Sequence, residues 1–172
     1  INMHDASLDE AGYLHVIRSK TAKLFEASAR LPAVLAASST LVEEACATYG
    51  QALGTAFQII DDVLDYDGDS AEMGKNLGDD LREGKATLPL IAAMQRGTPA
   101  QAATVREAIE NGNTDQLDAI AHIVRSTGAL DVARNAAAAE AQRAIAALEQ
   151  LPSNEYSAAL HQLASQLLAR RT

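Results

Sequence analysis

The sequence predicts an all-α protein, and two observations support that prediction. Apolar residues recur at helical spacing, first at Val105 and Ile109 and again at Leu117, Ile120 and Val124. No segment has the two-residue alternation that is typical of a half-buried strand. The chain has 172 residues, 48% hydrophobic and 22% charged, which is enough for one domain with a proper core. We find no internal repeat and no linker that divides it.

Capping and breaking residues set the limits of the predicted helices. Ser7 and Thr40 each open a pattern that fits a capping box, and Thr98 precedes a first-turn proline. Pro32 is expected to kink the first helix or to start a new segment. Three glycines follow helix ends, as C-terminal caps do: Gly97, Gly112 and Gly128. The predicted helices cover residues 8–31 with a continuation to 37, then 41–66, 88–96, 99–111, 115–126, 130–150 and 154–169.

Three acids follow a segment of sixteen uncharged residues, 45–60, near the end of the second long helix: Asp61, Asp62 and Asp65. On a helix, Asp61 and Asp65 lie on one face, and Asp62 lies about 100° round from Asp61. Their mutual repulsion grows in a partly desolvated cleft, and a bound cation relieves it. Carboxylates that offer only oxygen ligands suit Mg²⁺, which is commonly shared with a substrate phosphate. The sequence therefore predicts a magnesium site at these three residues.

The loop expected at residues 67–85 carries cations as well as acids. It contains four of the ten glycines together with Lys75, Arg82 and Lys85. Cations beside a metal-binding acid cluster indicate a polyanion, such as a diphosphate held by both Mg²⁺ and lysines. The simpler alternative is an acidic, solvated loop. The uncharged helix before it and the two lysines favour the diphosphate interpretation.

Composition argues against several other classes of function. A net charge of −9 disfavours nucleic-acid binding, and no uncharged stretch reaches the roughly 18 residues of a membrane span. Cys46 is the only cysteine, so it forms no internal disulfide, fits a reducing cytoplasm and is interpreted as a small buried side chain. No histidine follows a glutamate by three residues, as a di-iron bundle requires, and Cys and His are too scattered for zinc. The histidines are interpreted as surface or capping residues.

Residues 54–66, followed by 74–85, resemble the second aspartate-rich region of the trans-polyprenyl diphosphate synthases. Residues 19–26 (Ser-Lys-Thr-Ala-Lys-Leu-Phe-Glu) resemble the helix that carries that family's Lys-Thr pair, and residues 87–97 and 144–152 resemble its later helices. The likeness is strongest to the long-chain enzymes and covers nearly the whole chain. It implies the C-terminal part of the isoprenoid synthase helical bundle.

The resemblance also implies residue roles. The family condenses isopentenyl diphosphate with an allylic diphosphate, and a long-chain all-trans product of octaprenyl length, for a quinone side chain, is expected. Asp61, Asp62 and Asp65 are implied to hold Mg²⁺, and Lys20 joins them as a catalytic residue. The side chains implied to contact the allylic diphosphate are Lys20, Thr21, Gln58, Lys75 and Lys85, with Phe57 in the substrate cavity. Without the resemblance, Phe57 and Gln58 would be interpreted as structural and the Lys-Thr pair as a weak signal.

The resemblance sets limits as well. Family subunits are considerably longer, so residues 1–172 are expected to be one all-helical region, the C-terminal fragment of a synthase domain. The first aspartate-rich motif and the isopentenyl diphosphate site are expected to lie outside it. The fragment alone is expected to be inactive, and chain elongation by it with Mg²⁺ would refute that. The full-length protein is expected to be a cytoplasmic homodimer. Residues 84–87 read Gly-Lys-Ala-Thr where the family usually has Gly-Lys-Pro-Thr, a change that keeps the charge of Lys85.

Two other classes remain open. A non-catalytic subunit of a heteromeric synthase often lacks the aspartates that are present here. A class I terpene cyclase generally carries an Asn-Ser-Glu type second site in place of Asp-Asp-x-x-Asp. The motif that begins at Asp61 disfavours both alternatives.

Overall fold

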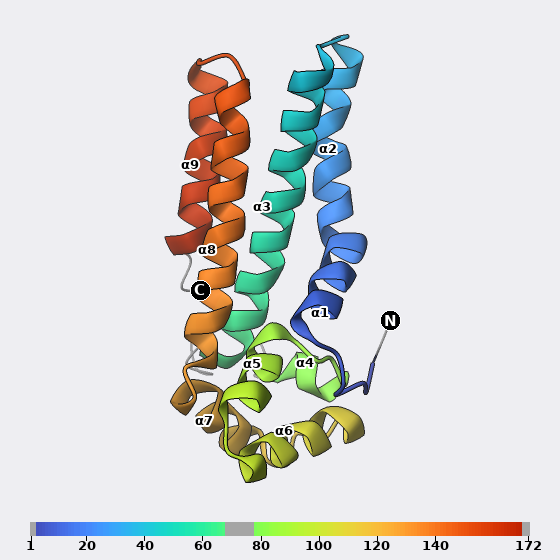
Figure 1. Cartoon of the computed structure of the whole chain (residues 1–172), viewed down its shortest axis with the longest axis vertical. Coiled ribbons are helices and arrows are strands. Elements are labelled where there is room, and N and C mark those ends of the chain that lie inside the picture. The colour runs from blue at the N-terminus through green and yellow to red at the C-terminus, as the bar shows by residue number, and fades with distance from the viewer. Residues whose placement is uncertain (1–2, 68–77, 170–172) are drawn as a thin grey trace. The chain divides into compact units, whose positions relative to one another are not determined.

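The computed structural model describes residues 3–67 and 78–169, and within these segments the protein is helical with no strand, which confirms the predicted all-α fold (Figure 1). The α-helices are α1 (Glu10–Ile17), α2 (Lys23–Leu35), α3 (Thr40–Asp67), α4 (Asp79–Arg82), α5 (Leu88–Arg96), α6 (Pro99–Asn111), α7 (Leu117–Ser126), α8 (Ala129–Ala147) and α9 (Glu155–Ala169). A π-helical segment, η1 (Arg18–Ala22), joins α1 to α2, and a 3-10 segment, η2 (Leu148–Gln150), follows α8. Across the described segments, no helix has both the length and the hydropathy that a membrane crossing requires.

The chain divides into two compact units. The described part of unit 1 comprises residues 3–14, 61–67 and 78–134, and that of unit 2 comprises residues 15–60 and 135–169. Unit 2 therefore contains η1, α2, most of α3, most of α8 and all of α9. Unit 1 contains the end of α3 and the short helices α4 to α7.

Unit 2 is a bundle of long helices in which small residues allow close packing (Figure 1). Its core cluster joins α3, α8, η2 and α9 through Tyr49, Ala52, Leu53, Ala144, Leu148 and Ala164. Where α3 crosses α2, a Cβ atom on Gly50 would lie 2.3 Å from the carbonyl oxygen of Phe25. A Cβ atom on Gly54 would lie 2.8 Å from Cα of Ala22. The missing side chains therefore let the two backbones approach each other directly.

Unit 1 is built from short helices around an aliphatic core, with α5 packing on both α6 and α7 and α4 packing on α6. The core side chains that are fully buried here include Leu81, Leu88, Leu90, Val105, Ile109, Ile120 and Val124. The segment before α1 also belongs to this unit. The His4 amide donates a 2.7 Å hydrogen bond to the Gly84 carbonyl, and Nδ1 of His4 lies 3.2 Å from the Ile109 carbonyl oxygen.

Most predicted helices are confirmed, with small shifts at their ends. Helices α5 and α6 have the predicted limits, and α3 extends one residue further at each end. Thr98 forms a reciprocal capping box with Gln101, and Gly112 ends α6 in the left-handed conformation. Helix α4 was not predicted. It is a single turn inside the expected loop, too short for periodicity to reveal, and Leu81 holds it through full burial.

The prediction that a new segment starts at Pro32 is wrong, while the alternative of a kink there stays a prediction. Helix α2 continues through this residue to Leu35. Pro32 and Ser28 are both exposed, so water can bond the carbonyl that the missing proline N–H leaves unpaired. A π-helical irregularity in this part of the chain lies at η1, where no proline or glycine marks it.

Two predicted caps are also wrong. Asp9, rather than Ser7, caps α1, because its Oδ1 accepts a 2.8 Å hydrogen bond from the Gly12 amide, while Ser7 bonds to Asp5. Ser39, rather than Thr40, caps α3 through a 3.4 Å bond from the Val42 amide to its Oγ. Near the start of each helix the chain has two residues that can cap it, and sequence alone does not rank them. The four histidines are exposed as predicted, whereas Cys46 is only partly buried.

Candidate functional site

The predicted acid cluster lies at the C-terminal end of α3, in unit 1. Asp61 and Asp65 are partly exposed and stand one turn apart on this helix, whereas Asp62 is only 3% exposed. The Tyr13 hydroxyl donates a 2.6 Å hydrogen bond to Oδ2 of Asp62. Burial, reinforced by the charge of Asp62, raises the pKa of Tyr13 well above its usual value, so the phenol remains a proton donor. Asp62 is thus held in one orientation by a residue that the sequence did not single out.

Lys85, predicted to contact diphosphate, is held by two acids of the same unit. Its Nζ lies 2.8 Å from Oδ1 of Asp80 and 2.8 Å from Oε2 of Glu83. Burial acts to lower the pKa of Lys85, but the hydrogen bonds and charges of Asp80 and Glu83 outweigh it and raise that pKa. The Asp80 amide in turn lies 3.4 Å from Oδ2 of Asp65. The structure therefore links Lys85 to the acid cluster, while Lys75 lies outside the described residues.

Two arginines bind the last turn of α3. Nε of Arg125 donates a 3.1 Å hydrogen bond to the Tyr66 carbonyl, and the Arg134 guanidinium pairs with Asp67. Positive charge at a helix C-terminus stabilises the helix, because the last carbonyl groups carry partial negative charge. These contacts fix the end of the helix that carries the acid cluster, and sequence analysis did not find them.

The predicted residues of unit 2 gather where η1 faces α3. Oγ1 of Thr21 donates a 3.1 Å hydrogen bond to Oε1 of Gln58. The rings of Phe25 and Phe57 are 5.8 Å apart between centroids and tilted by 33°. Lys20 is exposed on η1, next to Thr21. The structure therefore joins Thr21 to Gln58 and places Phe57 against Phe25.

A polar network in unit 2 was missed by sequence analysis. Arg18 and Arg143 both pair with Glu140, at 2.6 Å and 2.8 Å respectively. Arg143 also donates to Oε1 of Gln51 at 3.0 Å, and Nε2 of Gln51 lies 3.3 Å from Oε2 of Glu26. These residues come from η1, α8, α3 and α2, so the network crosslinks the bundle. Since its members are far apart in sequence, no local pattern could have revealed it.

The acid cluster can be tested for its fit to Mg²⁺. In the segments that the structure describes, no three His, Cys, Asp or Glu side chains form a group that could hold a metal by themselves. Mg²⁺ is usually bound through one or two carboxylates, with waters and phosphate oxygens as the remaining ligands. Asp61 and Asp65, partly exposed and one turn apart, provide such a donor set. The residues therefore fit a Mg²⁺ ion that is shared with a phosphate ligand.

Comparison with known proteins gives consistent matches. The polyprenyl synthetase family model matches residues 1–126. The chain is 48% identical over 165 residues to octaprenyl diphosphate synthase from Haemophilus influenzae, and 47% identical to the enzyme of that name from Escherichia coli. These matches cover 95% of this chain but 50% and 51% of the relatives, so the chain spans about half the length of the curated proteins that it matches.

Solved structures agree with this result. A polyprenyl synthase from Caulobacter crescentus, solved with calcium and isoprenyl diphosphate, has a TM-score of 0.92 and 41% identity, covering 100% of this chain and 53% of that one. A decaprenyl diphosphate synthase from Rhodobacter capsulatus has a TM-score of 0.90 and 37% identity, covering 99% of this chain and 53% of that one.

Proposed function

Because this chain belongs to the polyprenyl synthetase family, we propose that the protein containing it is a prenyltransferase. It adds isopentenyl diphosphate to an allylic diphosphate and makes a long-chain all-trans polyprenyl diphosphate, of octaprenyl length, for a quinone side chain. The identities of 48% and 47% to two octaprenyl diphosphate synthases support that product length. The structural observation that carries the proposal is the link from Asp65 through Asp80 to Lys85. This link supports the proposal, because it joins a carboxylate that suits a divalent cation, through Asp80, to an ammonium group that suits a diphosphate.

In unit 1, the acid cluster binds Mg²⁺ and Lys85 binds the diphosphate. Asp61 and Asp65 supply carboxylate oxygens, and Tyr13 keeps Asp62 in a fixed orientation beside them. Bound Mg²⁺ offsets the negative charge that develops on the departing diphosphate. An ammonium group has three N–H donors, and Lys85 gives two of them to Asp80 and Glu83. The third donates to a diphosphate oxygen.

In unit 2, Lys20, Thr21 and Gln58 bind the allylic diphosphate, and Phe57 contributes to the substrate cavity. The hydrogen bond from Thr21 to Oε1 of Gln58 fixes the orientation of the amide. The NH₂ group of Gln58 is then a donor for diphosphate oxygens, and the exposed ammonium group of Lys20 supplies positive charge. Lys75 is assigned to the same ligand on the basis of the resemblance.

The proposal is tested with the full protein that contains this sequence, incubated with Mg²⁺, an allylic diphosphate and labelled isopentenyl diphosphate. We expect the wild type to form polyprenyl products and Asp65→Asn to lose at least about 100-fold in kcat, since one ligand of the diphosphate-bound ion is weakened. Asp118→Asn is the matched control, because Asp118 is an exposed aspartate of α7 in the same unit. A wild type that forms no elongated product would refute the proposal, and equal loss in both variants would refute the role of Asp65.

Two further parts of the proposal concern assembly and location. The active protein is a homodimer in the cytoplasm, as the resemblance implies. Sedimentation of the full protein should give twice the subunit mass, and cell fractionation should recover it with cytoplasmic markers. A monomer that retains full activity would refute the first part.

A further inference from the structure

The segment η1 differs from the helices on either side of it. The Lys23 amide donates to the Arg18 carbonyl, five residues earlier, as in a π-helix. A π-helical turn contains one residue more than an α-helical turn and is less favourable, so it persists only where surrounding contacts hold it.

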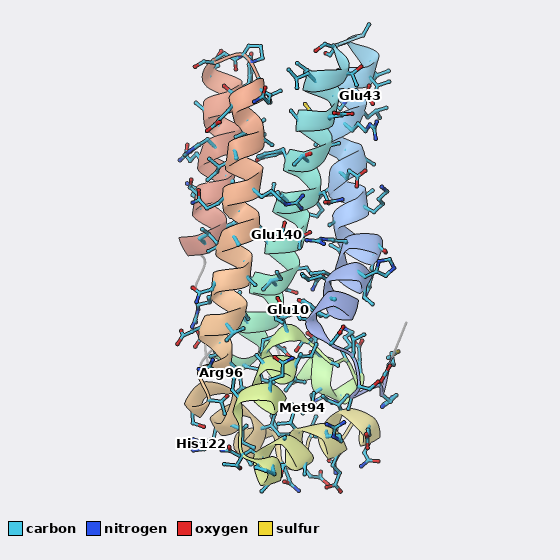
Figure 2. All side chains as sticks on the ribbon, in the orientation of Figure 1. Glu10, Glu43, Met94, Arg96, His122 and Glu140 are labelled. Carbon is cyan, nitrogen blue, oxygen red and sulfur yellow. The ribbon has the colours of Figure 1, made fainter. Side chains whose placement is uncertain are left out.

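An ion pair holds the first residue of η1. Nη2 of Arg18 lies 2.6 Å from Oε1 of Glu140 on α8, and the Glu140 side chain is only 12% exposed. Glu140 is itself fixed by Arg143, which also bonds to Gln51 on α3. Figure 2 shows Glu140 on α8, well along the bundle from its α8–α9 connection. Arg18 is therefore anchored to a carboxylate that Arg143 of the same helix keeps in place, and Arg143 is itself bonded to Gln51 of α3.

The other end of η1 lies against α3. Ala22 is fully buried, and its Cα occupies the space that a side chain on Gly54 would need. Thr21, one residue earlier, reaches Gln58 with a 3.1 Å hydrogen bond. If η1 relaxed to an α-helix, the chain before η1 and the chain after it would rotate relative to each other about the helix axis. The rotation would be about 100°, the angle of one helical residue. The contact of Arg18 with Glu140 and the contact of Thr21 with Gln58 could then not form at the same time.

We propose that Arg18 and Glu140 are positioning residues, which hold η1 in the π-helical register so that Thr21 and Gln58 act together on one ligand. The inference rests on the proposed function, because it takes that ligand to be a diphosphate. The pair does not touch the diphosphate itself. It acts through the backbone of η1, which carries Lys20 and Thr21.

The test uses Arg18→Gln in the full protein, with Arg30→Gln as the matched control. Arg30 forms an ion pair with Glu43 in the same unit, also with a 2.6 Å separation between Nη2 and Oε1. Figure 2 shows Glu43 close to the α2–α3 connection, away from Glu140. Calorimetry measures the affinity for inorganic diphosphate in the presence of Mg²⁺. A second experiment measures the rate of hydrogen exchange at the Lys23 amide. Steady-state kinetics then separate KM for the allylic diphosphate from kcat.

For Arg18→Gln we expect diphosphate affinity to fall about tenfold, with a matching rise in KM and a smaller change in kcat, since the binding groups are displaced. Exchange at Lys23 should accelerate, because its bond to the Arg18 carbonyl loses support. Arg18→Lys should recover part of the affinity, since a lysine can still pair with Glu140. Arg30→Gln should change affinity by less than about twofold, as is usual for an exposed pair.

The outcomes separate this inference from the proposed function. If the wild type binds diphosphate and Arg18→Gln binds it equally well, the inference is wrong. If the wild type binds no diphosphate, the proposed function fails, and unchanged exchange at Lys23 in Arg18→Gln would then overturn the inference as well. Should Arg18→Gln not fold, Glu140→Gln takes its place, with the same expected loss and the same overturning result.

Discussion

The Tyr13 hydroxyl donates a 2.6 Å hydrogen bond to Oδ2 of Asp62, and both side chains are buried, with 3% of each residue exposed. In the proposed metal site this bond matters, because it fixes the orientation of a carboxylate that lies beside the two proposed ligands, Asp61 and Asp65. The relationship joins residues 49 positions apart, so it is a property of the fold rather than of the aspartate motif.

We expect Tyr13→Phe to weaken Mg²⁺ binding about tenfold, because Asp62 loses the contact that orients it. Tyr49→Phe is the control, since Tyr49 is equally buried and donates one hydrogen bond, but to the Leu160 carbonyl in unit 2. Both variants should lose about 1 to 2 kcal/mol of unfolding free energy. Metal titration followed by calorimetry, together with denaturant unfolding, measures both effects. Equal Mg²⁺ affinities in the two variants would contradict the prediction.

Thr21→Val should raise KM for the allylic diphosphate about tenfold, because valine has a similar shape but cannot donate to Gln58. Thr21→Ser keeps the hydroxyl and should stay near the wild-type value. Thr104→Val is a matched control, because the Thr104 hydroxyl bonds the Ala100 carbonyl within its own helix, α6. Steady-state kinetics decide the matter, and a normal KM in Thr21→Val would remove the role assigned to this hydroxyl.

Glu26 should contribute a pH-dependent part of the stability. A hydrogen bond from Lys23, opposed by burial and aided by Gln51, lowers the pKa of Glu26 below its usual 4.5. The folded state therefore binds fewer protons than the unfolded state, and stability rises with pH in this range. The stabilisation is fully present above the unfolded-state pKa and is lost as the pH falls through the lower folded-state pKa.

Denaturant unfolding of the wild type and Glu26→Gln, from neutral pH to about pH 3, tests this expectation. The difference in unfolding free energy should be constant near neutral pH and should shrink below the usual glutamate pKa. Glu44→Gln is the control, because Glu44 is exposed on the same helix as Gln51 and has no ion pair among the described residues. A difference for Glu26→Gln that does not change with pH would show that this carboxylate is not stabilised in the folded state.

Gly54→Ala should destabilise unit 2 by about 1 to 3 kcal/mol, as overpacking does. The added methyl group would lie 2.8 Å from Cα of Ala22 and 2.9 Å from Cβ of Phe25, neither of which can move without displacing η1 or α2. Gly12→Ala in α1 is the control, since its methyl group would meet mainly the tip of the flexible Leu8 side chain, at 2.6 Å. Thermal unfolding should show a loss only for Gly54→Ala. Similar melting temperatures for the two variants would mean that α2 and α3 can separate at little cost.

The sequence by itself determined the helical fold and the face that carries the acids. Apolar periodicity, the capping box at Thr98 and the spacing of Asp61 and Asp65 all act between residues at most four positions apart, where helix geometry alone decides the outcome. For that reason the limits of α5 and α6 could be predicted to the residue. Local patterns do not decide which of two nearby residues caps a helix, as at Asp9 and Ser39, or whether a proline is tolerated on an exposed helix face. The alternatives differ in free energy by only about a few tenths to a few kcal/mol.

Only the tertiary structure decided how the site residues are held. The partners Tyr13 and Asp62, Thr21 and Gln58, and Arg18 and Glu140 are 49, 37 and 122 residues apart. Their contacts depend on which helix faces pack together, and the π-helical register of η1 exists because those contacts outweigh the preference of the backbone for an α-helix. No sequence pattern encodes that balance, since the energies that set it arise only when the bundle has formed.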